Sequence, residues 1–304
     1  MLHCEFFQEF SGHRGGIYRL VPGQEDIFYS VAGDGVVAQW ELGNVTATAL
    51  LQTDSPIFAA YIAQEQQLFF AGQQNGILQI LSLQTRKIVQ KINLSAPIYD
   101  IRVIHNQLWV ACGKGFCAVL DLNNFEKQHT IQLNNQNIRT ILPILGKQQV
   151  AISGSNGKIY LLNSNNYHIL QEWQAAVRTI FTLVEKPASN LPILYSGGLN
   201  AVLNRWCINP INKEVEISAH LFAINQIIII PEFSLLVSAS SDKSFKIWDL
   251  ETLTLLKVID PTKPKSHIAS INTICWLPNA QMLVTAGDDK RILSWKIYRN
   301  QHNN

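Results

Sequence analysis

Three groups of side chains in the sequence contain the residue types of a Ser–His–Asp catalytic triad, in which the imidazole takes the proton of a hydroxyl nucleophile. Each group also includes a tryptophan. The groups are His13, Ser30, Asp34 and Trp40; His220, Ser238, Asp242 and Trp248; and His267, Thr285, Asp289 and Trp295. An active site would occur once, whereas this set recurs three times and includes an indole donor. The set is therefore better explained as a hydrogen-bond network that satisfies buried polar groups. We therefore predict no catalytic residue and no enzymatic activity.

Metal and cofactor sites are not indicated either. No two of the eight histidines lie at the spacing of metal ligands, and the five cysteines include no Cys-x-x-Cys pair. The cysteines are instead expected to be small core residues in a reducing compartment. We predict neither a metal nor a cofactor.

The composition of the chain argues against nucleic acid and membranes as binding partners. Hydrophobic residues make up 47% of the chain and charged residues only 15%, with a formal net charge of +2. This charge is too small to favour nucleic acid or an anionic membrane. The N-terminus has no secretory pattern, and the apolar run Ile227–Ile230 is far shorter than the roughly 20 residues that cross a bilayer. We expect a cytoplasmic protein that does not bind membranes.

The elements that hold these groups repeat along the chain. Each copy contains a turn residue, a short apolar run and a Trp or Leu that serves as an anchor. The anchors are Trp40, Leu81, Leu120, Leu162, Trp206, Trp248 and Trp295. They lie 39 to 47 residues apart, and a period of about 40–45 residues is typical of a four-stranded propeller blade. The sequence thus predicts an all-β protein, a seven-bladed β-propeller of four-stranded antiparallel blades.

The first copy illustrates the four strands of a period. One run starts at Ile17, and the others are Ile27–Val31, Val36–Trp40 and Thr46–Leu51. Short runs rich in Val, Ile, Phe and Tyr between Gly, Asn and Asp are typical of strands joined by tight turns. Asp-Gly or Asn-Gly pairs supply residues that tolerate positive φ in a hairpin, and they occur at 34–35, 75–76 and 156–157.

The two ends of the chain complement each other. The chain finishes on a third strand, Arg291–Tyr298, so the last blade lacks its fourth strand. The N-terminal strand His3–Phe10 is expected to complete that blade and close the ring, which removes free sheet edges. An insertion at Glu185–Pro192 is expected on the face opposite to the binding face.

These residues resemble the WD-repeat (WD40) family, whose blades pair a Gly-His with a Trp-Asp around a Ser or Thr and an Asp. Trp248-Asp249 is the full dipeptide, and Trp40-Glu41 and Trp295-Lys296 vary it. The resemblance covers residues 3–298. It implies that residues 1–304 form a single WD40 β-propeller domain, a stand-alone seven-bladed member of the family.

The resemblance also implies a role for the three groups. In each blade the His, the Ser or Thr, the Asp and the Trp form a structural network of hydrogen bonds. The middle blades depart from this pattern, with Lys114 in place of an Asp and leucines at the anchors 81, 120 and 162. We expect these blades to depend on apolar packing.

A ring of contact positions follows from the same resemblance, at the residue after the first apolar position of each first strand. These predicted partner-binding residues are Tyr18, Phe58, Tyr99, Arg139, Arg178, Asn225 and Asn272. Aromatic and Arg side chains are enriched in binding hot spots, and two arginines could form a fork to a carboxylate. The alternative is that the seven side chains only line the channel mouth and pack against one another.

We therefore predict a non-catalytic protein-interaction scaffold that binds an acidic peptide or protein segment, alone or as a subunit of a larger complex. One alternative is a small-molecule-binding or enzymatic propeller that uses the channel mouth, which calls for converging carboxylates or histidines. A third hypothesis, nucleic-acid binding, also uses aromatic and Arg side chains. The low net charge argues against it.

Overall fold

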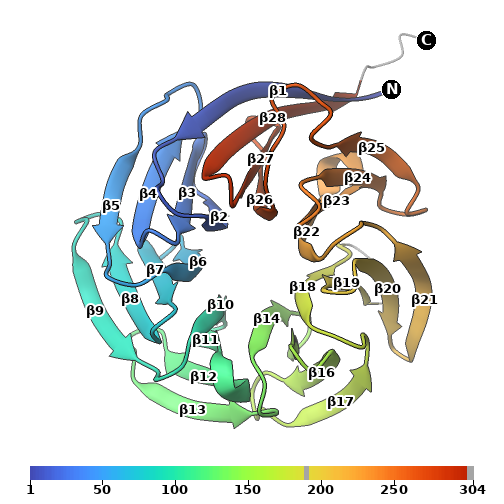
Figure 1. Ribbon diagram of the computed structural model, residues 1–304. Helices are drawn as coiled ribbons and strands as arrows, with labels where there is room; N and C mark the ends of the chain where they lie inside the picture. The colour runs from blue at the N-terminus through green and yellow to red at the C-terminus, as the bar shows by residue number, and fades with distance from the viewer. Residues whose placement is uncertain (188–191, 300–304) are drawn as a thin grey trace. The chain divides into compact units, whose positions relative to one another are not determined.

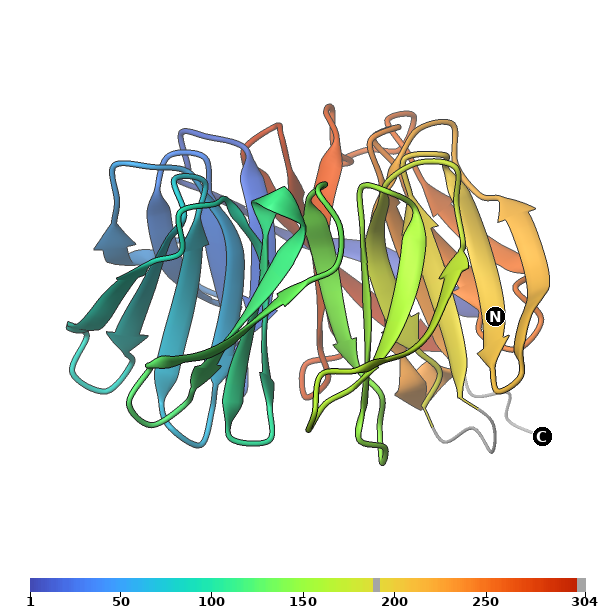
Figure 2. The ribbon, with the colours of Figure 1, turned by 90° about the horizontal axis from the view of Figure 1, so that it is seen from below.

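Short apolar runs separated by turn residues make this chain almost entirely β-structure. The computed structural model describes residues 1–187 and 192–299, and over these ranges the chain forms 28 strands of five to ten residues. The strands form seven sheets of four, and each pairs antiparallel with its neighbours (Figures 1 and 2). The predicted seven four-stranded antiparallel sheets are thereby confirmed.

The chain divides into two compact units, which we describe separately. The middle unit comprises residues 58–227, and the terminal unit comprises residues 1–57 together with the chain from 228 onward. The division falls within β6 and β22. The prediction that residues 1–304 form a single domain stays a prediction.

Sheets 2 to 5 occupy the middle unit. Sheet 2 contains β6 (Ile57–Ala63), β7 (Leu68–Gln73), β8 (Ile77–Ser82) and β9 (Ile88–Asn93); sheet 3 contains β10 (Ile98–Ile104), β11 (Gln107–Cys112), β12 (Phe116–Asp121) and β13 (Lys127–Gln132); sheet 4 contains β14 (Ile138–Pro143), β15 (Gln149–Gly154), β16 (Lys158–Asn163) and β17 (Ile169–Gln174); sheet 5 contains β18 (Ile180–Glu185), β19 (Ile193–Gly198), β20 (Val202–Ile208) and β21 (Ile211–Ser218).

Sheets 1 and 7 lie in the terminal unit, as does most of sheet 6. Sheet 1 contains β2 (Ile17–Pro22), β3 (Ile27–Ala32), β4 (Val36–Glu41) and β5 (Thr48–Gln52); sheet 6 contains β22 (Ile224–Ile230), β23 (Leu235–Ser240), β24 (Phe245–Asp249) and β25 (Leu255–Ile259); sheet 7 contains β26 (Ile271–Leu277), β27 (Met282–Gly287), β28 (Arg291–Arg299) and β1 (Leu2–Ser11).

The N-terminal strand completes the last sheet, as the sequence predicts. β1 pairs antiparallel with β28 from Leu2 opposite Arg299 to Ser11 opposite Arg291 (Figure 1). Both ends of the chain are thus held in one sheet. Arg291 adds a two-pronged ion pair to Glu9, with its Nε and Nη2 at 2.8 and 2.7 Å from the two carboxylate oxygens.

All seven anchors occupy one register position, opposite the second residue of the second strand. Trp40 pairs with Phe28, Leu120 with Leu108, and the other anchors follow the same rule. The leucines that replace Trp in sheets 2 to 4 are at most 1% exposed. Full burial of a leucine contributes about 1.5–3 kcal/mol, in line with the apolar packing expected of these sheets.

Burial differs strongly between inner and outer strands. β23 and β27 are buried at every position. In β9 and in β17, by contrast, the first four of the six residues are all exposed. The apolar side chains of neighbouring sheets form shared cores within each unit. The second and third strands therefore give the core, and the fourth strands form the outer surface.

The predicted hairpin turns are also present. Gly35, Gly76 and Gly157 have φ of +76°, +88° and +71°, a region that glycine enters at little cost. Helical structure in the described ranges is confined to the two 3₁₀ turns Gly113–Gly115 and Pro231–Phe233, too short to cross a membrane. Within the predicted insertion Glu185–Pro192, residues 188–191 lie outside the described residues.

Candidate functional site

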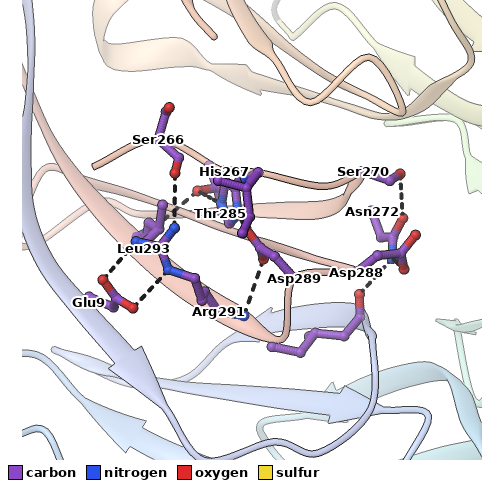
Figure 3. A network of polar contacts seen from close by, with 12 residues as sticks. Glu9, Ser266, His267, Ser270, Asn272, Thr285, Asp288, Asp289, Arg291 and Leu293 are labelled. Carbon is purple, nitrogen blue, oxygen red and sulfur yellow. Dashed lines mark hydrogen bonds and ion pairs between the residues drawn. The ribbon is translucent and has the colours of Figure 1, made fainter. Parts of the chain in front are cut away.

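The four predicted network residues of sheet 7 are joined by hydrogen bonds, and Figure 3 shows three of them, His267, Thr285 and Asp289. His267 Nδ1 lies 2.8 Å from Asp289 Oδ2, and His267 Nε2 lies 2.8 Å from Thr285 Oγ1. Trp295 Nε1 donates to the same hydroxyl at 3.0 Å. Asp289 also accepts the backbone amides of Ile268 and Arg291. This geometry connects a loop, a turn and two strands in the interior, as a structural network does.

Sheet 1 has the same arrangement. His13 Nε2 lies 2.7 Å from Ser30 Oγ, and Nδ1 lies 3.0 Å from Asp34 Oδ2. Trp40 Nε1 donates to Ser30 Oγ at 2.8 Å. Because the serine hydroxyl is held between an imidazole and an indole, it is a bridging group of the interior.

Sheet 6 contains the bond from Trp248 Nε1 to Ser238 Oγ, at 2.9 Å. Sheet 5 contains an equivalent bond that the sequence analysis missed, from Trp206 Nε1 to Ser196 Oγ at 3.0 Å. The signal was present in the sequence, because each of these serines or threonines lies ten residues before its tryptophan.

Removing the Ser196 hydroxyl should destabilise the protein modestly. In Ser196→Ala the indole N–H of Trp206, which is 5% exposed, loses its acceptor. An unsatisfied buried donor costs about 1–3 kcal/mol, so we expect the free energy of unfolding to fall by about 1 kcal/mol. Urea denaturation measures this. An unchanged free energy would mean that the bond contributes nothing net.

The network carboxylates also predict acid sensitivity. Burial raises the pKa of Asp34, but the amides of Arg14 and Val36 and the His13 ring outweigh it and hold the pKa below its usual 3.8. A carboxyl with a lowered folded pKa stabilises the protein above the unfolded pKa, and this stabilisation is lost as the pH falls through the folded pKa.

Urea denaturation of the unaltered protein and of Asp34→Asn between pH 7 and pH 3 tests this. We expect the stability advantage of the unaltered protein to be constant above about pH 5 and to shrink below about pH 4. An advantage that stays constant down to pH 3 would contradict a lowered pKa for Asp34.

The contact positions share one structural feature. Each is the second residue of the first strand of its sheet, and in sheets 1, 3, 4, 5 and 7 the pairing with the second strand skips it. Such a β-bulge re-aims the side chain out of the ladder. The residues at this position are Tyr18, Phe58, Tyr99, Arg139, Phe181, Asn225 and Asn272.

The predicted placement of Arg178 in this register is wrong. β18 begins at Ile180, which is 1% exposed and pairs with Gly198, so Phe181 occupies the contact position of sheet 5. Arg178 lies in the preceding loop and is exposed. The partner-binding role of all seven predicted residues, Arg178 included, stays a prediction.

Four of these side chains form a continuous column in the middle unit. The rings of Phe58 and Tyr99 are stacked, with centroids 6.0 Å apart and an interplanar angle of 6°. The guanidinium carbon of Arg139 lies 4.0 Å from the Tyr99 centroid and 5.6 Å from the Phe181 centroid. We call Phe58, Tyr99, Arg139 and Phe181 the cation–aromatic column.

Arg139 is the charged member of this column and is unusually poor in polar partners. Its Nε is buried without a hydrogen-bond partner in the described part of the chain. Burial lowers the pKa of its guanidinium, which the nearby Tyr99 opposes, yet an arginine stays protonated at neutral pH. The two aromatic contacts hold its plane in place, so the site is a fixed cation.

The contact positions of the terminal unit are occupied differently. Asn272 Nδ2 donates to Asp288 Oδ1 at 2.6 Å and to the Ile17 carbonyl at 3.1 Å (Figure 3). Its Oδ1 accepts Ser270 Oγ at 3.0 Å. Tyr18 is 37% exposed. Asn272 is thus engaged in contacts within the protein, as the packing alternative for this ring expects.

A set of hydrogen-bond acceptors that was not predicted from the sequence lies two residues after the start of a first strand. Asp100, which is 0% exposed, accepts the amide of Ile141 in the next sheet at 2.9 Å and forms an ion pair with Arg102 at 2.8 Å. Thr182 accepts the amide of Ile227 at 3.1 Å. These bonds fasten neighbouring first strands within the middle unit. The signal was a polar residue among the apolar residues that begin the strand.

The five cysteines lie in the core. All are free and buried, and burial raises the pKa of Cys4 and of Cys112 to about 12. A protonated, buried thiol is a poor nucleophile. The prediction that the cysteines are core residues is confirmed.

Comparisons with known proteins agree with this geometry. Residues 212–249 and 261–296 match the family model described as "WD domain, G-beta repeat" (WD40), and the two segments contain Trp248 and Trp295. The crystal structure of the WD40 β-propeller domain of Doa1 is similar, with a TM-score of 0.85 and 13% identity, over 97% of each chain. At this identity the likeness shows the fold, a β-propeller.

Proposed function

Because the chain is a seven-bladed WD40-repeat β-propeller, we propose that it binds a carboxylate-bearing segment of a partner protein at Arg139. WD40 propellers are generally protein-interaction scaffolds and typically not enzymes.

The fixed cation in the cation–aromatic column carries the proposal. The guanidinium of Arg139 is held between Tyr99 and Phe181, and no carboxylate pairs with it among the described residues. An isolated charge is costly to desolvate unless it is paired. The column therefore holds a desolvated positive charge that a ligand carboxylate would neutralise.

Arginine suits this role because of its shape. A guanidinium presents its donors in a planar fork that matches the two oxygens of a carboxylate, and it stacks on aromatic faces at the same time. The rings of Phe58, Tyr99 and Phe181 provide rigid apolar surface beside that fork. Such a combination is typical of a binding hot spot.

The residues at the contact positions also support binding over acid–base catalysis. None of the seven residues from Tyr18 to Asn272 at this position is a carboxylate or a histidine. General acid–base catalysis depends chiefly on those groups, so a channel-mouth enzyme gains no support here.

The test uses peptides of equal length that differ only in Glu against Gln. Binding to the unaltered protein is measured by fluorescence anisotropy in low and moderate salt. We expect the Glu peptides to bind at least about tenfold more tightly than the Gln peptides and to weaken with salt. Equal affinities for both sets would refute the proposed function.

A further inference from the structure

Exposed apolar residues collect in the loops that lead into the first strands of sheets 5 and 6. Three residues before the strand, sheet 5 has Val177, which is 92% exposed, and sheet 6 has Leu221, which is 85% exposed. Sheets 1 to 4 carry polar residues at this position, Arg14, Asp54, Ser95 and Asn135. Sheet 7 has Ile268 at this position, which is 68% exposed. The aliphatic residues are therefore confined to sheets 5 to 7 and do not follow from the fold.

Backbone hydrogen bonds hold these loops next to each other within the middle unit. The amide of Leu199 donates to the Thr179 carbonyl at 2.9 Å, and the amides of Ala219 and His220 donate to the Ala201 carbonyl at 3.1 and 3.2 Å. Residues 175–179, 199–201 and 219–223 thus form one neighbourhood.

Two further exposed side chains enlarge the surface. Phe222 is 63% exposed and Leu199 is 43% exposed. We call Val177, Leu199, Leu221 and Phe222 the apolar platform. Single exposed apolar residues are common on proteins, but a cluster of four bulky ones is typical of an interaction site.

The charge around the platform indicates what covers it. Arg178 is exposed within the first loop, and residues 175–179, 199–201 and 219–223 include no Asp or Glu. Loops with one exposed cation and no carboxylate of their own attract an acidic partner. The platform is therefore suited to a segment that carries both bulky apolar and acidic side chains.

The platform is also connected to the cation–aromatic column. The loop that contains Val177 and Arg178 runs directly into β18, whose second residue, Phe181, contacts the Arg139 guanidinium at 5.6 Å. A segment seated on Arg139 can therefore continue along this loop onto the platform.

We propose that the platform binds bulky apolar side chains, Leu or Phe, that neighbour the acidic residue of the partner segment. This inference rests on the proposed function, because it assigns the apolar half of the same ligand. Carboxylate recognition belongs to Arg139, and apolar recognition belongs to the platform.

Two peptides separate these contributions by fluorescence anisotropy. The first carries Glu among Gly and Ser, and the second carries the same Glu with two neighbouring Leu residues. We expect the second peptide to bind the unaltered protein about tenfold more tightly. Leu221→Ser/Phe222→Ser should abolish this gain and leave the affinity for the first peptide unchanged.

Leu145→Ser is the matched control, because Leu145 is 75% exposed in the turn between β14 and β15, at the other end of the first strand. It should retain the full gain. Val177→Ser, at the most exposed platform position, provides a second variant, and thermal melting verifies that each variant is folded.

The outcomes distinguish the two proposals. If the Glu peptide binds but the leucines add nothing, or Leu221→Ser/Phe222→Ser keeps the gain, the platform proposal fails and the proposed function stands. If the leucines bind equally well without Glu, the proposed function fails. Sedimentation that shows a dimer abolished by Leu221→Ser/Phe222→Ser would assign the platform to a second copy of this chain and overturn the inference.

Discussion

Replacement of Asp289 with alanine should lower the free energy of unfolding by about 3 kcal/mol. The side chain of Asp289 is 1% exposed and lies 2.8 Å from His267 Nδ1. It also accepts the amides of Ile268 and Arg291. Alanine would leave the His267 ring nitrogen and the Arg291 amide, both partly buried, and the exposed Ile268 amide without this acceptor. Removal of one partner of such a network costs far more than the network contributes net.

Chemical denaturation of Asp289→Ala and of the matched variant Asp54→Ala measures this effect. Asp54 is exposed, and its side chain makes no hydrogen bond within the described ranges, so its loss should change stability by less than about 0.5 kcal/mol. An Asp289→Ala protein as stable as the unaltered one, yet without a partner-binding or enzymatic activity, would contradict the structural role of the network.

Replacement of Arg139 with glutamine should weaken binding of a Glu peptide by about 10- to 100-fold. Glutamine keeps some length and hydrogen-bonding capacity but removes the charge and the guanidinium plane that rests on Tyr99. Because Nε of Arg139 is buried without a partner, removal of the charge relieves a desolvation cost. The variant should therefore melt at the same temperature as the unaltered protein or slightly higher.

Arg86→Gln is the control for a general effect of charge. Arg86 is exposed between β8 and β9 in the same unit, and its substitution should leave peptide affinity unchanged. Arg139→Lys is expected to recover only part of the affinity, since a lysine has the charge but not the planar fork. Equal losses for Arg86→Gln and Arg139→Gln would mean that only the net charge matters.

The strand pattern and the network were predictable from the sequence because their signals are local. Trp40 and Trp295 mark a register position that recurs in every sheet. The glycine at position 35 indicates a turn with positive φ, which the structure has there. The spacing between His13 and Asp34 is fixed by a hairpin, so a side-chain contact follows from it. The strand Leu2–Ser11 could be matched to the last sheet because only one strand was missing there.

The start of β18 was not predictable in the same way. Val177 and Ile180 are both aliphatic and only three residues apart, so either can be taken as the first apolar position of the strand. Burial separates them, since Val177 is 92% and Ile180 1% exposed. Burial depends on the neighbouring sheet, which the sequence does not specify, and the contact position consequently falls on Phe181 instead of Arg178.

The cation–aromatic column required the three-dimensional arrangement. Its members are about 40 residues apart in sequence, so no local pattern shows that Tyr99 stacks on Phe58 and also supports Arg139. The same is true of Asp100, whose acceptor role toward Ile141 connects two sheets. The residue types could be read from the sequence, whereas the pairs of residues that contact each other could not.

A double-mutant cycle between Arg139 and the ligand carboxylate shows whether the two groups contact each other. Affinities are measured by calorimetry for the unaltered protein and Arg139→Gln, each with a Glu peptide and its Gln counterpart. A direct pair predicts a coupling energy of at least about 1.5 kcal/mol, with Arg139→Gln unable to distinguish the two peptides. Additive effects, within about 0.5 kcal/mol, would show that the carboxylate does not contact Arg139 and would contradict the proposed function.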